Sequence, residues 1–266
     1  FYDPFAKIRK FYCGLGTFSA SNSSNILAAV DCTPYHVTYA ATSNIQDNND
    51  LVFSYNFTDV ADFIQNGGTY YFIVYATSFA GIVSATASNG VIVDTTAPHG
   101  IVSHMNSAFA QTLQFQVDST TLHAQWQFTE SQSCITGYEI GISSRKSQSN
   151  PDNIVAFLDV GMNTSHSIQN LSLVHNTKYY ISIRSTNIVY LSKIQFSAGI
   201  IIDTTPPIAT AANLVDFVAH INSTIDQDYY PSFNSTIKGS WTGAFVDGES
   251  GIAEYFVGVG NTSSSP

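Results

Sequence analysis

The chain has 266 residues, and typical domains of about 150 residues favour two domains or a run of smaller ones. Only 11% of the residues are charged, while 44% are hydrophobic and 13% aromatic, which indicates folded cores and excludes a disordered or coiled-coil chain. The formal charge of −10 excludes nucleic acid as a partner, because affinity for a phosphate backbone needs clustered cations.

The first twelve residues form an aromatic and basic segment, Phe1 to Tyr12, with five aromatic and three basic side chains. It shows no signal-peptide pattern, so a mature or excised piece is expected. The segment lies outside the internal repeat described below. One interpretation makes it the first strand of an irregular first domain. The other has it add as a strand to an exposed sheet edge of a neighbouring copy, a general mode of assembly.

The three cysteines are Cys13, Cys32 and Cys134, and their spacings match no zinc or redox motif. Cys13 with Cys32 is a disulfide candidate that would close a short loop, which chain entropy values at about 3 kcal/mol. Cys134 would then be unpaired or bonded between chains. The alternative is three buried free thiols that act as small apolar side chains.

An internal repeat begins in the first third of the chain. The segment Tyr70 to Ser78 aligns with Tyr179 to Asn187 at an offset of 109 residues, and Val93 to Pro98 aligns with Ile202 to Pro207 in the same register. A third copy begins further on: residues 122–126 match 237–241, and residues 135–141 match 252–258.

Within the copies, apolar and polar residues alternate, as in Tyr179, Ile181 and Ile183, which is the period of a half-buried strand. No stretch shows convincing helical periodicity, and no apolar run reaches the ~18 residues of a membrane helix, so no membrane-spanning segment is expected. Short strands in units of about a hundred residues predict an all-β chain of β-sandwiches.

These residues resemble the fibronectin type III family, whose members are immunoglobulin-like, seven-stranded sandwiches. Leu173, Thr177 and Tyr179 are similar to that family's strand E to F signature, with His175 and Asn176 where Pro and Gly are usual. The resemblance implies that Tyr179 is a corner tyrosine, bonded through its hydroxyl to the preceding chain. The core aromatic residues that it implies are Trp126, Tyr138, Tyr179, Tyr70, Trp241 and Tyr255.

The resemblance divides the chain into three parts. Residues 1–98 are a degenerate or partial first β-sandwich with an N-terminal extension, 99–207 a complete one, and 208–266 the first strands of a third. Asp-Thr-Thr-Ala-Pro and Asp-Thr-Thr-Pro-Pro segments join them. Proline restricts φ and Asp and Thr bond locally to amides, so short, stiff linkers are expected. The family resemblance implies modules stacked end to end.

No residues have the spacing of a catalytic constellation, so no enzyme activity, no cofactor and no metal are expected. The seven histidines are scattered, and the two Gly-x-Gly motifs lack the helix that phosphate binding requires. The one carboxylate cluster, Asp247 to Gly251, supplies too few oxygens for calcium by itself. A solvated turn is the favoured interpretation of the cluster.

Seven asparagines occupy the Asn-x-Ser/Thr acceptor pattern of N-linked glycans: Asn22, Asn56, Asn163, Asn170, Asn222, Asn234 and Asn261. Chance alone would produce about four. Together with the low charge and the cysteine usage, the pattern favours a secreted eukaryotic glycoprotein at the cell surface or outside the cell. Unoccupied sequons on a polar surface are the alternative.

Two classes of function follow from these patterns. The first is a structural extracellular glycoprotein, rod-like or the protomer of a hair, pilus-like fibre or matrix fibril, which self-assembles with neighbouring copies through its modules. The second is an adhesion or receptor ectodomain that binds a protein or carbohydrate through its loops. The sequence has no Arg-Gly-Asp motif to favour the second class. A third possible class of function is an accessory module of a secreted enzyme.

Overall fold

The computed structural model describes residues 8–18, 24–33, 54–105, 114–210, 215–217 and 238–260. Throughout these ranges the regular elements are strands, so the predicted all-β class is confirmed. None of these residues belongs to a helix that could cross a membrane. The chain divides into two compact units, one of residues 1–99, 128–137 and 185–193 and one of residues 100–127, 138–184 and 194–266.

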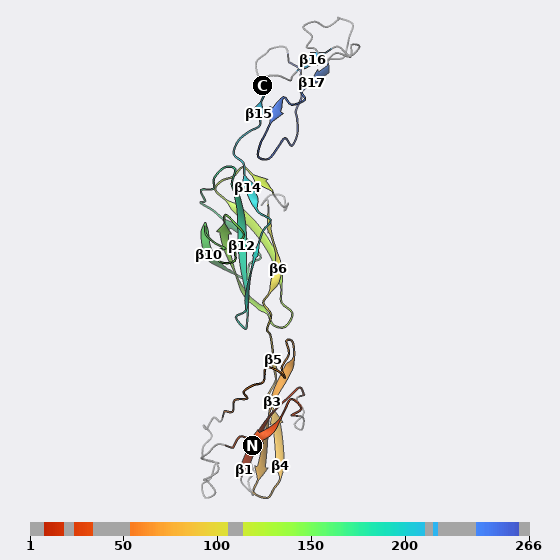
Figure 1. The fold of residues 1–266 in the computed structure, drawn as a ribbon, viewed down its shortest axis with the longest axis vertical. Helices are drawn as coiled ribbons and strands as arrows, with labels where there is room; N and C mark the ends of the chain where they lie inside the picture. Colours follow the sequence, from red (N-terminus) through yellow and green to blue (C-terminus); the bar gives the residue numbers. More distant parts are fainter. Residues whose placement is uncertain are drawn as a thin grey trace. The chain divides into compact units, whose positions relative to one another are not determined.

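The first unit contains a five-stranded sheet in the order β2-β1-β3-β4, with β5 paired to β3 (Figure 1). Four residues of its longest strand are buried, namely Tyr70, Ile73, Ala76 and Ser78, and Cys13 of β1 is buried as well. The strands are β1 (Ile8–Gly16), β2 (Leu27–Asp31), β3 (Thr69–Ser78), β4 (Val83–Ala87) and β5 (Val91–Ile92).

The next nine strands form a β-sandwich of two sheets. One sheet has the order β10-β9-β12-β14-β7, with β13 paired to β12, and the other has the order β11-β8-β6 (Figure 1). The strands are β6 (His99–His104), β7 (Phe115–Gln116), β8 (Leu122–Thr129), β9 (Ile135–Ser143), β10 (Val155–Gly161), β11 (Ser165–Ile168), β12 (Lys178–Asn187), β13 (Ser192–Phe196) and β14 (Ile200–Ile202).

The core of the sandwich lies between these two sheets. In β8 every second residue is buried, from Leu122 to Phe128. Trp126 of this strand is 3% exposed and meets Tyr138 of β9, which is 4% exposed, with ring centroids 5.9 Å apart. Because the two residues come from different sheets, this edge-to-face pair spans the interior. The sandwich therefore has the aromatic core that the family resemblance implies.

Both predicted corner tyrosines have the same contacts. The amide of Gln65 donates to the Tyr70 hydroxyl at 2.7 Å, and the amide of Val174 donates to the Tyr179 hydroxyl at 3.0 Å. Both rings are buried. Each hydroxyl therefore satisfies an amide of the preceding chain while its ring fills the end of a core.

The sequence repeat is repeated in the strand register. Thr69 and Tyr70 of β3 pair with Ile92 and Val91 of β5, and the residues 109 positions later, Lys178 and Tyr179, pair with Ile201 and Ile200. Just before β5 and β14, Gly90 and Gly199 have φ values of 88° and 91°. A side chain would be strained in this left-handed conformation, so glycine is required at the same point of both copies.

The described part of the N-terminal segment forms the first strand of the first unit, as the first of the two interpretations has it. Ile8–Gly16 forms β1, which is paired on one edge with β2 and on the other with β3. In the sandwich, β9 lies in the same way between β10 and β12. Residues 8–12 thus have the same place in their sheet as the start of β9 has in the sandwich, and they pair with β3. Residues 1–7 lie outside the described ranges.

The third copy is less complete in its described residues. Strands β15 (Ile208–Ala209) and β18 (Phe245–Val246) pair with each other, as do β16 (Val215–Phe217) and β17 (Lys238–Ser240). Tyr255, which the family resemblance places in a core, is 45% exposed, and Trp241 is half-buried. Their ring centroids lie 6.0 Å apart. Residues 252–260, which include Tyr255, form no strand.

Candidate functional site

The first linker, residues 94–98, is held by side chains from both sides of it in the sequence. The hydroxyl and the amide of Thr96 donate to Asp94 Oδ1 at 3.2 and 3.0 Å. The amide of Thr95 donates to Asn66 Oδ1 at 2.8 Å. From the following repeat, the hydroxyl of Ser133 donates to Asp94 Oδ2 at 2.5 Å. We call this set of contacts the first clasp.

Two further residues complete the first clasp. Thr96 Oγ1 donates to Gln132 Oε1 at 2.9 Å. The side-chain amide of Asn187 donates to Asp94 Oδ2 at 2.9 Å, to the Thr96 carbonyl at 3.1 Å and to Glu130 Oε2 at 3.2 Å. Asn187 is fully buried. One amide group therefore joins the linker to the loop between β8 and β9.

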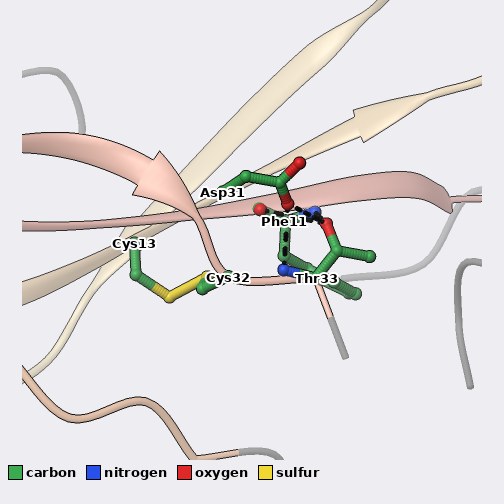
Figure 2. Close-up of a disulfide and its surroundings, with 5 residues drawn as sticks. All are labelled: Phe11, Cys13, Asp31, Cys32 and Thr33. Atoms are coloured by element: carbon green, nitrogen blue, oxygen red, sulfur yellow. Dashed lines mark hydrogen bonds between the residues drawn. A yellow bond between two sulfur atoms is a disulfide. The ribbon is translucent and has the colours of Figure 1, made fainter. Parts of the chain in front are cut away.

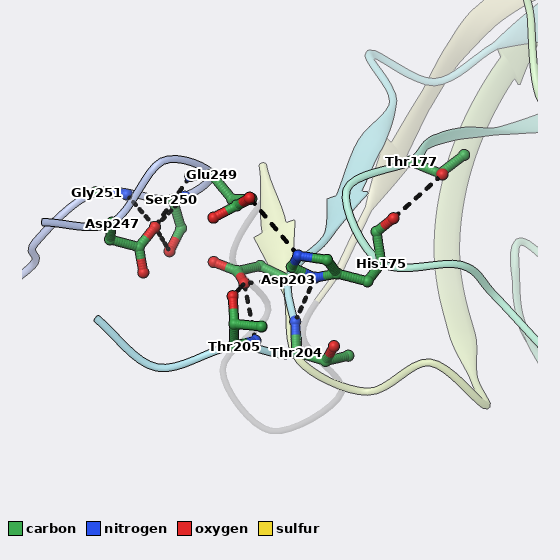
Figure 3. A network of polar contacts seen from close by, with 9 residues as sticks. All are labelled: His175, Thr177, Asp203, Thr204, Thr205, Asp247, Glu249, Ser250 and Gly251. Atoms are coloured by element: carbon green, nitrogen blue, oxygen red, sulfur yellow. Dashed lines mark hydrogen bonds and ion pairs between the residues drawn. The ribbon is translucent and has the colours of Figure 1, made fainter. Parts of the chain in front are cut away.

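The second linker, residues 203–207, is held by an equivalent set, the second clasp (Figure 3). The hydroxyl and the amide of Thr205 both donate to Asp203 Oδ1 at 3.1 Å, and the amide of Thr204 donates to His175 Nδ1 at 3.2 Å. Each of these residues lies 109 positions after its counterpart in the first clasp. The two linkers are thus fixed by the same local contacts.

The loop that faces each linker is also repeated, at an offset of 117 residues. Glu130 Oε1 accepts from the amides of Ser131 and Gln132 at 2.8 and 3.3 Å. Its counterpart Asp247 accepts from the amides of residues 249, 250 and 251 at 3.1, 2.8 and 3.0 Å. These bonds make Asp247 the cap of a tight turn, and the carboxylate cluster of the sequence is this turn.

The pKa of each linker carboxylate is lowered for the same reason. The pKa of Asp94 is lowered chiefly by the hydrogen bond from the Ser133 hydroxyl, followed by the bond from the Thr96 amide. The pKa of Asp203 is lowered chiefly by the Ser250 hydroxyl, followed by the Thr205 amide. Hydrogen bonds to a carboxylate stabilise its charged form, so both aspartates are acceptors in their clasps at neutral pH.

The clasps differ at two positions that face each other. Where the first has Asn66 and Gln132, the second has His175 and Glu249. His175 Nε2 lies 3.6 Å from Glu249 Oε1, and its Nδ1 lies 3.8 Å from Asp203 Oδ1. The second clasp therefore brings one imidazole and two carboxylates together. Of the three equivalent side chains in the first clasp, Asp94 is the only ionisable one.

Sequence reasoning did not bring together the residues that complete the clasps, although it named His175 in the family signature and Glu249 in the carboxylate cluster: Asn66, Gln132, Asn187, His175 and Glu249. The offsets of 109 and 117 residues could have pointed to some of them, since Asn66 and His175 share the first offset and Gln132 and Glu249 the second. The contacts themselves join positions up to 93 residues apart, so only the fold shows them.

The disulfide candidate is present in the first unit, where it joins Cys13 of β1 to Cys32, next to β2, with the two Cα atoms 5.8 Å apart (Figure 2). Beside it, the amide of Phe11 donates to Thr33 Oγ1 at 2.9 Å, and Thr33 Oγ1 donates to Asp31 Oδ1 at 2.6 Å. The Lys10 ammonium and then the Thr33 hydroxyl lower the pKa of Asp31 to about 2. Cys134 is an exposed free thiol.

Three of the seven sequons belong to the described residues. The side chains of Asn56, Asn163 and Asn170 are exposed, so a glycan on any of them would extend into solvent. Asn170 lies in the left-handed region with φ of 58°. The other four, Asn22, Asn222, Asn234 and Asn261, lie outside the described ranges.

Two cavities are alternative candidate sites. The larger, of about 230 Å³, is an open groove on β6 and β8 lined by Ile101, Ser103, Met105, Gln125, Trp126 and Gln127. The smaller, of about 110 Å³, lies beside the disulfide and is lined by Phe11, Cys13, Cys32, Ser54, Tyr55, Phe72 and Val74. Neither lining includes a carboxylate, an imidazole or an amine, so neither offers an acid and base pair.

Comparison with known proteins gives structural neighbours only. No family model matches the chain, and no curated protein matches it. Domains A168-A170 from titin are similar over 53% of this chain and 43% of that one, at 18% identity and a TM-score of 0.33. The FN1-FN3 domains of chicken contactin are similar over 71% of this chain and 56% of theirs, at 15% identity and a TM-score of 0.30.

The chain thus spans about half the length of each of these two structures. Its fold class rests on its own topology: two packed sheets that are antiparallel except for the parallel pair β14 and β7, corner tyrosines and a repeated register. The described residues thus contain a fibronectin type III-like, immunoglobulin-like β-sandwich, and the sheet of the first unit repeats part of its strand register.

Proposed function

We propose that this chain is a structural extracellular glycoprotein, a rod or the protomer of a cell-surface filament or matrix fibril. The observation that carries the proposal is the repetition of the clasp. Asp94 and Asp203 accept bonds from a threonine of their own linker, Asp94 accepts one from Ser133 of the following loop, and the equivalent Ser250 lowers the pKa of Asp203. A linker held by side chains on both sides resists bending, and a rod needs such linkers.

The composition of the chain and its disulfide support an extracellular location for the protein. Only 11% of the residues are charged, so solubility depends on polar and glycosylated groups, and low charge lets neighbouring subunits approach without strong repulsion. The disulfide belongs to an oxidising compartment. Neighbouring copies of the chain and N-linked glycans are the partners in this proposal.

Negative-stain microscopy of the native, glycosylated material tests assembly. The proposal predicts ordered filaments or straight rods of uniform width. A matched preparation of the Asp94→Ala, Asp203→Ala double variant should give bent particles or shorter filaments, because both linkers lose their acceptor. Monodisperse monomers with freely variable bending in the unaltered protein would contradict the proposal.

Glycosylation has a separate test. Glycosidase treatment of the secreted protein, followed by intact mass, should remove mass from the native chain. Replacement of Asn163 and Asn170 by Gln should reduce that loss, since both are exposed in the sandwich. No mass loss in the native protein would remove the glycoprotein part of the proposal while leaving assembly to be decided by microscopy.

Binding through loops is the second candidate function, and one observation favours it. The hairpin after β12 presents Ile188 and Tyr190, which are 56% and 88% exposed, and the equivalent hairpin after β3 presents Phe79 and Ile82 at 55% and 67%. Exposed apolar groups gathered at hairpins are typical of interaction sites. Monomers that lose adhesion to cells when Tyr190 is replaced by Ser would favour an adhesion ectodomain over the filament.

A further inference from the structure

We propose that the second clasp binds a divalent transition metal ion, with zinc as its first choice, through His175, Asp203 and Glu249. One donor atom from each of the three residues lies within 4.8 Å of the others. The three come from different parts of the fold, namely the turn before β12, the second linker, and the turn capped by Asp247 (Figure 3). A single ion there would cross-link the linker to both turns.

The spacing of the donor atoms favours an ion over a direct bond. His175 Nε2 and Glu249 Oε1 are 3.6 Å apart, which is too long for an N–H···O hydrogen bond. Two ligands of a tetrahedral zinc ion lie about 3.3 Å apart, given metal to ligand distances near 2.0 Å. A small adjustment of either side chain therefore brings both atoms to coordination distance.

The two carboxylates of the second clasp share a single basic partner. The side chains of Asp203 and Glu249 are 6% and 21% exposed, so their charges are only partly screened by water. Among the ion pairs of the described residues, His175 is the only basic partner of either carboxylate, whereas the other two pairs are Lys10 with Asp31 and Arg184 with Glu139. A divalent cation would neutralise both carboxylates at once.

The first clasp provides an internal comparison. There the equivalent positions are Asn66, Asp94 and Gln132, and they are satisfied by neutral hydrogen bonds from Thr95, Thr96 and Ser133. In the second clasp both amide side chains are replaced by metal ligands, while the aspartate is kept. The same backbone arrangement therefore accommodates one carboxylate with two side-chain amides in one linker and a ligand set in the other.

The donor set selects the class of metal. Imidazole with carboxylates suits zinc and its first-row neighbours, and three protein ligands leave a fourth position for water. Calcium takes six or more oxygen ligands and no nitrogen by preference. The site therefore favours zinc, and calcium serves as the negative control.

Binding has a local signature at the linker. The Thr204 amide donates to His175 Nδ1, so in the neutral ring the proton is on Nε2, which faces Glu249. Coordination through Nε2 shifts that proton to Nδ1, and the Thr204 amide loses its acceptor. Zinc should therefore change the tautomer of one histidine and the NMR position of one linker amide together.

The test is titration of the full, metal-free chain with zinc chloride by calorimetry. His175→Asn and Glu249→Gln introduce the residues of the first clasp, so both variants should fold, which circular dichroism checks. We expect one zinc ion per chain, and affinity about tenfold or more weaker in each variant. His99→Asn, which alters an exposed histidine beside the first linker, should bind zinc as the unaltered chain does.

Three results would overturn the proposal. They are no zinc binding by the unaltered chain, zinc affinity in both clasp variants equal to that of the unaltered chain, or displacement of zinc by equimolar calcium. An unchanged Thr204 amide in zinc-saturated protein would also contradict coordination by His175. None of these outcomes depends on whether the chain forms filaments. The metal site and the proposed function are therefore tested independently of each other.

Discussion

His104 is a buried histidine at the end of β6, 2% exposed, with Nε2 2.7 Å from the Ser197 hydroxyl. Its pKa is lowered to about 4, chiefly by burial and also by the nearby Lys178 charge, against a backbone hydrogen bond with Tyr179 that raises it. The folded protein therefore holds this imidazole neutral well below the pH at which an unfolded histidine, with a pKa near 6.5, takes up a proton.

This difference makes the sandwich acid-sensitive. Because the folded pKa is depressed, the contribution of His104 is complete above about pH 6.5 and is lost as pH falls towards 4, by roughly 3 kcal/mol in all. In urea unfolding at pH 7 and pH 4.5, His104→Gln should lose stability less steeply with acid than the unaltered chain. His166→Gln, a half-buried control, should keep the full pH dependence. Equal pH dependence in the His104 variant would contradict the assignment.

The corner tyrosines allow a matched pair of variants. Tyr70→Phe and Tyr179→Phe keep the buried rings but remove the acceptors of the Gln65 and Val174 amides. Each should lower the free energy of unfolding of its own module by about 1 kcal/mol, the usual value of such a bond. Two-step thermal unfolding would show which module is affected. A loss confined to one tyrosine would mean that the two corners are not equivalent.

At the scale of elements, the disulfide stabilises only the first sheet. It closes a loop between positions 19 residues apart, which chain entropy values at about 3 kcal/mol. Cys13→Ser with Cys32→Ser should lower the melting temperature of the first unit and leave the transition of the sandwich unchanged in calorimetry. Cys134→Ser, the exposed free thiol, is the control and should change neither transition.

The linkers are the elements on which the proposed function depends. Asp94→Ala removes the acceptor for Thr96, Ser133 and Asn187. Limited proteolysis within residues 94–98 should then be several-fold faster, because local opening costs less. The second linker should be cleaved at its original rate. Cleavage of both linkers at unchanged rates would show that the clasp does not restrain the chain.

The sequence predicted the elements that repeat. The offset of 109 residues identified β3 and β12, both corner tyrosines and both linkers, because alternation and turn residues are local signals. A strand at Ile8–Gly16 was one of its predictions but its place in the repeat was not, since this segment shares little with Ile135–Ser143 except its position between two strands. Tyr255 is 45% exposed, unlike its counterpart Tyr138, and a residue pattern alone does not show which elements cover a side chain.

The clasps could be predicted only in part. Asp94, Thr96 and their counterparts were visible as linker residues with local hydrogen bonds. Their partners Ser133 and Asn187 lie 39 and 93 positions away from Asp94. Such contacts depend on which loops the fold brings together, and a single sequence carries no direct signal of that kind.

The whole molecule is a chain of units whose linkers are held by a repeated polar contact and whose described cores are separate. The described residues of the sandwich bury Trp126, Tyr138 and Tyr179 in one core, whereas Tyr70 is buried in the first unit. Stability should therefore be nearly additive between modules, while bending depends on the two linkers.

Amide hydrogen exchange at the linkers tests this central claim most directly. The amides of Thr95, Thr96, Thr204 and Thr205 all donate to clasp side chains, so the account predicts protection at all four positions in the native chain. Asp94→Ala should abolish protection at Thr96 only, and Asp203→Ala at Thr205 only. Exchange of all four amides at the rate of an unstructured peptide would contradict the account.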